Sequence, residues 1–284
     1  MMRNELVQPG CRTAARIPWA NPIFRWAGSK RQLLRELISH VPAQYSRYIE
    51  PFAGSACLFF ALHPSEAVLG DRNAELIATY STIRSHPWLV HSTASNWPIT
   101  SKFYYELRDS LSEAAEPITA AARFTYLNRY CFNGVFRSNK AGVFNVPMGN
   151  GMGDFPCAAS FYRCSVALRR AELRAADFED CLKDVLPSDF VYLDPPYAKS
   201  EGRFRGEYGF GAFSARDIDR LLVCLDHLDK KGAKFLLSYS YCREIRRAMA
   251  TWRQRSVLVR RHVAGFSQDR GRVREVLLAN YALV

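Results

Sequence analysis

The sequence predicts an α/β protein with a mostly helical insert between the two halves of its sheet. Near both ends of the chain, short apolar runs alternate with stretches of helical spacing, which is typical of an open sheet covered by helices. Residues 85–175 lack this alternation. The chain has 284 residues, of which 48% are hydrophobic, so it can bury a large core in one elaborated domain.

The first half of the alternation lies before residue 85. Residues 29–41 predict a helix, because leucine, isoleucine and valine recur on one helical face. Residues 45–62, "YSRYIEPFAGSACLFFAL", predict a strand, a tight turn and a helix. Residues 67–84 repeat this pattern, with a short strand at Val68 and Leu69 that ends at Asp71.

The alternation resumes with "FVYLDPPY", residues 190–197. Its apolar residues predict a buried strand, which Pro195 and Pro196 end because proline donates no ladder hydrogen bond. The glycine-rich residues 198–213 then predict a loop. After this loop we expect one helix, ending at Gly232, and two strands, over residues 214–232, 233–240 and 274–283.

We therefore expect three parts in the chain. Residues 1–22 have no apolar signal core and predict a frayed extension. Residues 23–84 and 176–284 form the sheet domain, and residues 85–175 form the insert. The insert has helical patches followed by a long loop rich in glycine and asparagine, and such loops are usually functional or disordered.

Composition suggests a partner and a compartment. The net charge is +12, which favours a polyanionic partner such as nucleic acid, although many basic proteins bind no polyanion. The eight cysteines form no C-x-x-C pair and the six histidines show no ligand spacing, so we expect no metal site and a reducing, cytoplasmic compartment. No apolar run is long enough for a transmembrane helix, and we expect a monomer in solution.

Two positions at strand ends suggest a nucleotide-type cofactor. Gly54 lies in a strand-to-helix turn, where a residue without Cβ allows close approach of a ligand. Asp71 ends the next strand, where a carboxylate can reach ribose hydroxyls. A glycine required only for packing would look the same. Because G-x-G-x-x-G is absent, a cofactor without pyrophosphate is favoured, and S-adenosylmethionine fits.

Asp194 has two interpretations from the residues alone. At the carboxyl end of a buried strand it stands where open α/β sheets bind their ligands. Alternatively, Asp194, Pro195 and Pro196 form only a turn, and Tyr197 is a packed aromatic side chain.

A set of motifs favours the functional interpretation of Asp194. "FRWAGSKRQLL", "IEPFAGSACLFF", "LGDRNAELIATY", "YLNRYCFNGVFRSNKAGVFNVPMG" and "VYLDPPY" occur in this order. Together they closely resemble the Dam-type DNA adenine-N6 methyltransferases, the α group of the amino-methyltransferases. The resemblance covers residues 23–284. It implies a Rossmann-like methyltransferase sheet whose insert is a DNA-recognition subdomain, with S-adenosyl-L-methionine as cofactor and double-stranded DNA as partner.

The resemblance also assigns residues to the site. Those expected at the cofactor are Trp26, Gly28, Lys30, Phe52, Gly54, Ser55, Asp71 and Asp194. Those expected to act in catalysis are Asp194, Pro195, Pro196 and Tyr197. Those expected at the DNA are Arg25, Asn128, Arg129, Phe132, Asn133, Val135, Arg137, Asn145 and Pro147. Two residues depart from the family: Ala56 replaces a second glycine, and Ser29 replaces the second glycine of "WAGGK". A positive φ at either would weaken cofactor binding.

The implied mechanism starts with base flipping, because the target amine lies inside the duplex. Asp194 and the Pro195 carbonyl would accept hydrogen bonds from the adenine amine, and Tyr197 would stack on the base. The methyl group would then pass directly, in line, from sulfur to N6. Phe132 would intercalate, and Arg137 would pair with guanine.

Several roles stay open at this point. Arg25 can read a base or contact a phosphate, and Arg129 can instead hold the loop. The arginines from Arg243 to Arg274 predict a solvated basic face, although those in "SQDRGRVR" can also form a hairpin that grips phosphates. The alternatives for the whole chain are cytosine-N4 methylation of DNA and a DNA-binding module with an inactive cofactor site.

Overall fold

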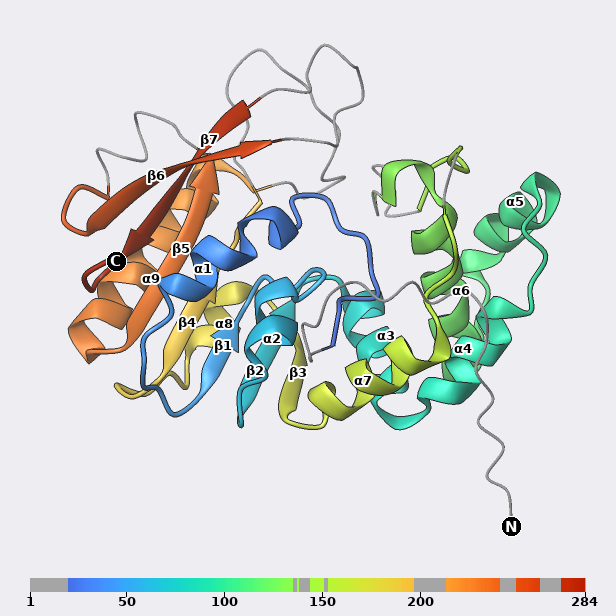
Figure 1. Cartoon of the computed structure of the whole chain (residues 1–284), viewed down its shortest axis with the longest axis horizontal. Helices are drawn as coiled ribbons and strands as arrows, with labels where there is room; N and C mark the ends of the chain where they lie inside the picture. The colour runs from blue at the N-terminus through green and yellow to red at the C-terminus, as the bar shows by residue number, and fades with distance from the viewer. Residues whose placement is uncertain are drawn as a thin grey trace.

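The computed structural model describes residues 20–134, 137, 144–150, 153–196, 213–240, 249–260 and 272–283. Its centre is a seven-stranded sheet of order β3-β2-β1-β4-β5-β7-β6 (Figure 1). The strands are β1 (Tyr48–Glu50), β2 (Ala67–Asp71), β3 (Ala171–Ala175), β4 (Phe190–Leu193), β5 (Lys234–Ser240), β6 (Arg253–Arg260) and β7 (Arg272–Ala279). The predicted α/β class is confirmed.

The strand directions define where a ligand can bind. β3, β2, β1, β4 and β5 are parallel, whereas β7 is antiparallel to both β5 and β6. From β1 the chain goes first to β2 on one side and later to β4 on the other. The order therefore reverses between β1 and β4, and the carboxyl ends of these two strands flank the switch point of the sheet.

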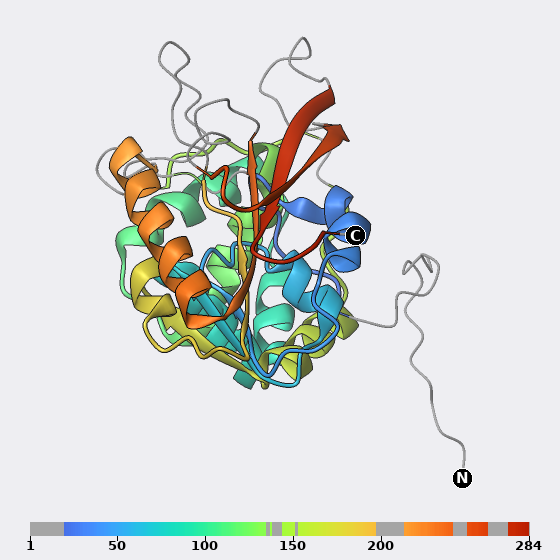
Figure 2. The same ribbon diagram turned by 90° about the vertical axis from the view of Figure 1, so that its left-hand side faces the viewer.

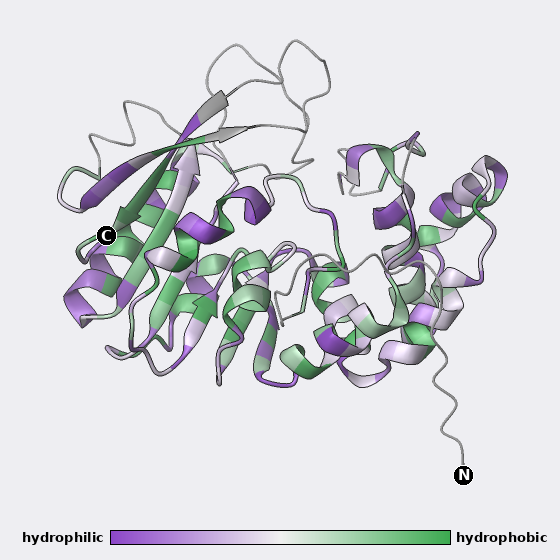
Figure 3. Cartoon of the chain, viewed as in Figure 1, coloured by the Kyte–Doolittle hydropathy of each residue, from purple (hydrophilic) through white to green (hydrophobic). Residues whose placement is uncertain are grey.

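Helices cover both faces of the sheet (Figure 2). One face carries η1 (Lys30–Leu33), α1 (Leu34–Ser39), α2 (Cys57–Leu62), α3 (Ala74–Ser85) and α7 (Ala158–Leu168). The other face carries α8 (Phe178–Leu182) and α9 (Ala215–Lys231). Phe190 and Tyr192 of β4 pack into the first core, and Val191 and Leu193 pack into the second. Because both faces are covered, all four residues of β4 are buried. Figure 3 shows hydrophobic residues along the central strands of the sheet.

Local signals set the ends of the helices. Ser214 and Asp217 form a capping box at the start of α9, and Gly232 ends the helix with a left-handed φ of 78°. The side chain of Asn73 accepts a hydrogen bond from the backbone amide of Leu76 and so caps α3. These helices lie where the sequence predicts them.

The helical lobe stands beside the sheet (Figure 1). It contains α4 (Pro87–Ser95), α5 (Ser101–Asp109), η2 (Ser110–Ser112), α6 (Pro117–Tyr130) and η3 (Phe132–Gly134). Its core is rich in tyrosine, including Tyr104, Tyr126 and Tyr130. However, β3 pairs with β2, so the sheet extends into the segment 85–175 that the sequence assigned to the insert. β3 therefore belongs to the sheet and not to the insert.

The C-terminal region differs from the sequence-based expectation. β6 falls within the stretch that was predicted to be a solvated basic face, and β7 begins and ends earlier than the predicted strand 274–283. Arg253 and Arg274 are nevertheless exposed. Arg270 lies outside the described residues. None of the helices in the described ranges has the length and apolar character that a membrane-spanning helix requires.

Candidate active site

Three carboxyl groups lie at the carboxyl ends of neighbouring parallel strands. Glu50 is the last residue of β1, Asp71 is the last residue of β2, and Asp194 directly follows β4. The parallel registers of β1 with β2 and β4 bring these ends to one edge of the sheet. This edge is the predicted ligand edge, and Asp71 and Asp194 occupy the predicted strand ends on it.

Asp194 is held by two donors on one oxygen. The Nζ of Lys30 lies 2.7 Å from its Oδ1, and the hydroxyl of Ser238 donates to the same oxygen at 3.1 Å. Burial raises the pKa of Asp194 above its ordinary value, while the charge and hydrogen bond of Lys30 and the hydrogen bond of Ser238 oppose that rise. The side chain of Asp194 keeps 19% of its surface exposed, so a ligand can reach it.

Lys30 begins η1 and is almost fully buried, with 5% of its side chain exposed. Its ammonium also donates to the carbonyl of Gly28 at 2.9 Å and lies 4.0 Å from Oε2 of Glu275 on β7. Lys30 therefore joins the loop before η1 to two strands of the sheet. The structure thus brings the predicted residues Gly28, Lys30 and Asp194 together, and it adds Ser238 and Glu275, which the sequence did not single out.

Asp71 organises the glycine turn after β1. Its Oδ2 accepts from the backbone amide of Gly54 at 2.9 Å, and its Oδ1 accepts from that of Asn73 at 2.9 Å. Burial raises the pKa of Asp71, and these two amides oppose the rise. Tyr80 of α3 donates its hydroxyl to the carbonyl of Gly54 at 2.9 Å. The turn is therefore fixed from both sides.

Gly54 is required at this turn for two reasons. Its φ of +46° lies in the left-handed region, and a Cβ added there would meet Cδ1 of Trp26 at 2.6 Å. Trp26, a predicted cofactor residue, therefore lies directly against Gly54. A second turn links Trp26 to Ser29, whose amide donates to the Trp26 carbonyl at 3.1 Å, with Gly28 at a φ of 78° between them.

The two departures from the family differ in their backbone conformation. Ser29 has a φ of −49°, so a side chain is unstrained there. Ala56 has a φ of 49° and a ψ of 40°, which is a left-handed conformation that favours glycine. Ser55, a predicted cofactor residue, donates its hydroxyl to that of Ser29 at 3.1 Å, and the two hydroxyls lie 3.1 Å and 3.0 Å from the Sγ of Cys57. These contacts connect the two loops that the sequence assigns to the cofactor.

Glu50 is a buried acid that the sequence-based site omits. It is 3% exposed, and the hydroxyl of Tyr48 donates to its Oε2 at 2.9 Å. Burial raises the pKa of Glu50 well above its ordinary value, the Tyr48 hydrogen bond opposes the rise, and the charge of Asp194 adds to it. Glu50 ends a strand, and an acid at a strand end is the signal that identified Asp71, so the sequence contained a signal for Glu50 as well.

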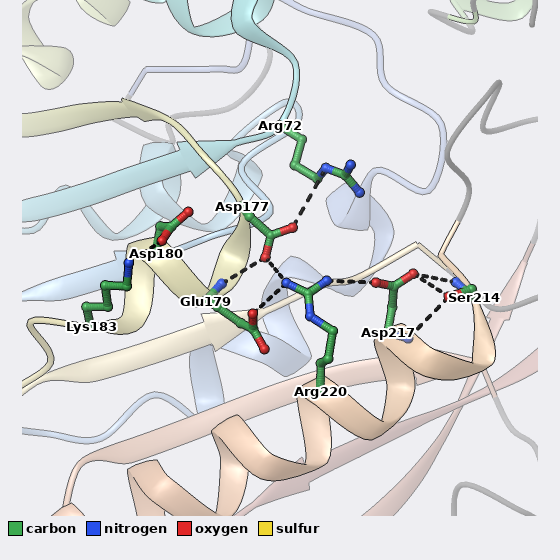
Figure 4. Close-up of polar contacts among 8 residues, drawn as sticks. All are labelled: Arg72, Asp177, Glu179, Asp180, Lys183, Ser214, Asp217 and Arg220. Carbon is green, nitrogen blue, oxygen red and sulfur yellow. Dashed lines mark hydrogen bonds and ion pairs between the residues drawn. The ribbon is translucent and has the colours of Figure 1, made fainter.

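Phe52 packs against aromatic and charged side chains, among them Phe178 from the segment that follows β3. Its ring stacks on Phe178, with 5.3 Å between centroids, and the guanidinium of Arg220 covers the Phe178 ring at 4.7 Å. Arg220 also contacts the carboxylates of Asp177, Glu179 and Asp217 (Figure 4). Asp177 and Phe178 follow β3 after Ala176, whose amide donates to the carbonyl of Asp71 at 3.1 Å, so they lie at the same sheet edge as Asp71. The sequence-based site missed both.

The predicted DNA residues after α6 lie on two adjoining segments. The amide of Phe132 donates to the carbonyl of Pro147 at 2.8 Å, and the amide of Gly149 donates to the carbonyl of Tyr130 at 2.9 Å. Asn133 adopts a left-handed φ of 56° in this loop. Phe132 is 45% exposed, which is unusual for a large aromatic ring. Asn133, Asn145 and Pro147 are also exposed, so these four residues are presented together.

Asn128, which the sequence predicts to contact DNA, is buried in the structure. It is 1% exposed, its Oδ1 accepts from the amide of Arg25 at 2.9 Å, and its Nδ2 donates to the Arg25 carbonyl at 2.7 Å. Asn128 thus fastens the segment before Trp26 to α6 and does not face a ligand. The side chain of Arg25 packs on Gly134. A Cβ added to Gly134 would lie 2.3 Å from the Cβ of Arg25.

Arg129 is half-buried beside Arg25. Burial and the neighbouring charge of Arg25 lower its pKa, and its buried Nε has no hydrogen-bond partner among the described residues. Arg137 is partly buried, and its carbonyl accepts from the amide of Asn145 at 3.3 Å. The predicted residues Val135 and Tyr197 lie outside the described residues.

The sheet order, with β7 antiparallel to both of its neighbours, is consistent with the fold of a methyltransferase. The sequence model of the D12 class of N6-adenine-specific DNA methyltransferases matches residues 26–263, and the chain belongs to this family. The resemblance inferred from five motifs is confirmed. The protein is an enzyme that methylates N6 of adenine in DNA, with a methyl donor as co-substrate. In the part of the chain that the structure describes, no cluster of His, Cys, Asp or Glu has the arrangement of a metal site.

Individual relatives are similar over most of the chain. The Type II methyltransferase M1.LlaDCHI of Lactococcus lactis subsp. cremoris is 32% identical over 273 residues, which are 92% of this chain and 95% of that protein. The DNA adenine methylase of Salmonella typhi is 29% identical over 260 residues, 89% of this chain and 93% of that protein. The DNA N-6-adenine-methyltransferase of Escherichia phage P1 is 30% identical over 90% of this chain and 35% of that protein.

Proposed function

We propose that the enzyme methylates adenine at a specific site in double-stranded DNA, with S-adenosyl-L-methionine as the methyl donor. The residues at the sheet edge suit this donor, because Asp71 and Asp194 present carboxyl groups there and carboxylates attract a cationic sulfonium. When bound, S-adenosyl-L-methionine supplies a methyl group on a positively charged sulfur. Of the two alternatives, cytosine-N4 methylation is not favoured by the family, and an inactive module is not favoured by the intact contact of Lys30 with Asp194.

The cofactor-holding roles follow from the loops at this edge. Asp71 is proposed to bind the ribose hydroxyls with the lone pairs that its two amide contacts leave, because each carboxylate oxygen accepts more than one hydrogen bond. Gly54 lets the adenosyl group approach the backbone. The residues proposed to line the same site are Trp26, Gly28, Lys30, Phe52 and Ser55.

Asp194 carries the proposed chemistry. The amine of adenine is a weak nucleophile because its lone pair is delocalised into the ring. A carboxylate that accepts a hydrogen bond from this amine favours the pyramidal, reacting nitrogen over the planar one. The observation that carries the proposal is the ion pair of Asp194 with Lys30 at 2.7 Å, which favours the ionised carboxylate against the effect of burial on its pKa. The carbonyl of Pro195 is proposed as the second acceptor, and Tyr197 as a stacking partner.

The loop after α6 is proposed to open the duplex. Phe132 is exposed beside Asn133, and both occupy a turn that the hydrogen bond to Pro147 fixes. An aromatic side chain presented in this way can fill the gap left by a flipped base. Arg137 and Val135 are proposed to read base edges, and Arg25 to contact a base or a phosphate.

The proposed function is tested with Asp194→Ala and Asp194→Asn and with labelled S-adenosyl-L-methionine and duplex DNA. Asparagine keeps the size of aspartate but loses its charge. Both variants should lose methyl transfer while DNA binding stays close to that of the wild type, because duplex affinity comes mainly from phosphate contacts. Transfer at the wild-type rate by either variant would show that Asp194 is not the acceptor. The predicted cytoplasmic location stays a prediction.

A further inference from the structure

Ser238 lies beside Asp194 because of the register between two parallel strands. Tyr192 of β4 is opposite Leu236 of β5, and Leu193 is opposite Leu237. The residue that follows β4 is therefore next to Ser238. Side chains alternate between the faces of a strand, so Tyr192, Asp194 and Ser238 share the face that η1 and α1 cover.

A chain of hydrogen bonds runs along this face. The hydroxyl oxygens of Tyr192 and Ser238 are 3.0 Å apart, and Ser238 donates to Oδ1 of Asp194 at 3.1 Å. Ser238 is 0% exposed and Tyr192 is 2% exposed, so water does not compete for these groups. Both hydroxyls belong to the sheet itself, where backbone pairing fixes their positions.

The direction of the chain follows from proton counting. An ionised carboxylate only accepts hydrogen bonds, and a serine hydroxyl has one proton to donate. Ser238 must therefore give its proton to Asp194, and Tyr192 must donate to Ser238. Burial raises the pKa of Tyr192 well above its ordinary value, with the charge of Asp194 adding to the rise, so the phenol keeps the proton that this direction requires.

The two donors on Oδ1 orient the carboxylate. Lys30 and Ser238 together occupy the lone pairs of this oxygen, whereas no hydrogen bond to Oδ2 exists among the described residues. We propose that Ser238, oriented by Tyr192, is a positioning residue that locks Asp194 so that Oδ2 faces the reacting amine. This inference rests on the proposed acceptor role of Asp194.

The test compares Ser238→Ala with Ser165→Ala. Ser165 is a matched control, because it is also 0% exposed and donates to a buried acceptor, the Arg84 carbonyl, at 2.7 Å on α7. Each variant is assayed for kcat at saturating S-adenosyl-L-methionine and DNA, for the dissociation constants of both, and for the pH dependence of kcat. Thermal unfolding reports any general loss of stability.

Ser238→Ala should lower kcat roughly tenfold or more with duplex affinity unchanged, because a hydrogen bond to a charged group is lost. The acid limb of its kcat profile should move to higher pH, because the substitution removes a donor that stabilises the ionised form of Asp194 in the wild type. Ser165→Ala should lower thermal stability to a similar degree and leave both kinetic readouts unchanged. If Ser238→Ala behaves like Ser165→Ala, Ser238 is only structural and the inference is wrong.

A second pair of variants tests the relay itself. Tyr192→Phe removes only the hydroxyl that orients Ser238, so its loss of kcat should be smaller than that of Ser238→Ala. The double variant should be no slower than Ser238→Ala, because Tyr192 acts through Ser238. Additive losses would contradict the relay. Activity of Asp194→Asn at the wild-type rate would instead defeat the proposed function, so the two failures are distinguishable.

Discussion

Replacement of Lys30 by methionine probes how the enzyme keeps Asp194 ionised. The side chain of Lys30 is 5% exposed and its Nζ lies 2.7 Å from Oδ1 of Asp194, so its loss removes a short, charge-assisted hydrogen bond from a poorly solvated carboxylate. Such a contact is worth about 1.5–3 kcal/mol, and about 1.4 kcal/mol corresponds to one pKa unit. The pKa of Asp194, which burial already raises, should therefore rise by a further one to two units, approximately.

The sign of the kinetic effect follows from which form is active. Only the ionised carboxylate of Asp194 acts purely as a hydrogen-bond acceptor toward the adenine amine. The value of kcat therefore falls as the pH drops through the pKa of Asp194. In Lys30→Met this acid limb should move upward by about one to two pH units, and activity should partly return at alkaline pH. The assay is kcat measured against pH with saturating DNA and S-adenosyl-L-methionine.

A surface lysine supplies the control for this experiment. Lys183 pairs with Asp180 on α8, but 70% of the lysine side chain and 53% of the aspartate side chain are exposed (Figure 4). Lys183→Met should leave the profile unchanged, because exposed pairs contribute little. A uniform loss of rate in Lys30→Met without a shift of the acid limb would show that Lys30 does not control the ionisation of Asp194. Asp194→Asn in the Lys30→Met background should recover stability but not activity, since it removes the unpaired buried charge.

Three further predictions concern the cofactor loops and the DNA. Asp71→Ala should weaken S-adenosyl-L-methionine binding on the order of tenfold to a hundredfold by calorimetry with DNA affinity unchanged, because a charge-assisted contact is lost, and equal affinity would contradict its assignment. Ala56→Gly should raise the free energy of unfolding in urea by up to about 1 kcal/mol, since relief of the left-handed φ exceeds the loss of one buried methyl group, and a clear fall would show that the strain is absent. Arg137→Ala should relax discrimination at one base pair by about 1–3 kcal/mol in competition assays with altered sites, whereas an equal loss on every site would indicate a phosphate contact.

The parts of the fold that carry strong local signals are predictable from the sequence. β4 spans the predicted residues because both of its faces are covered, which makes it apolar throughout. α9 has a capping box and a terminal Gly232, so both of its ends are encoded locally. The carboxyl ends of β2 and β4 follow from the same patterns, and with them the positions of Asp71 and Asp194.

The parts that were missed depend on tertiary contacts. β6 is an edge strand with arginines on its exposed positions, so its sequence resembles a solvated basic segment. β3 is short and half-polar at the opposite edge, and it becomes a strand only through pairing with β2. Asn128 looks like a recognition residue within its motif, but it is buried by its two contacts with the Arg25 backbone, which lies 103 residues away in sequence. Ser238 carries no local signal and is revealed only by strand register.

The identity of the modified base tests the proposed function most directly. The wild type and Asp194→Ala should be expressed in a host without DNA methylation, and the genomic DNA should be sequenced for modified bases and digested for mass spectrometry. We expect N6-methyladenine at one short duplex motif in the wild type and none in the variant. N4-methylcytosine in place of N6-methyladenine, or equal N6-methyladenine in the Asp194→Ala strain, would contradict it.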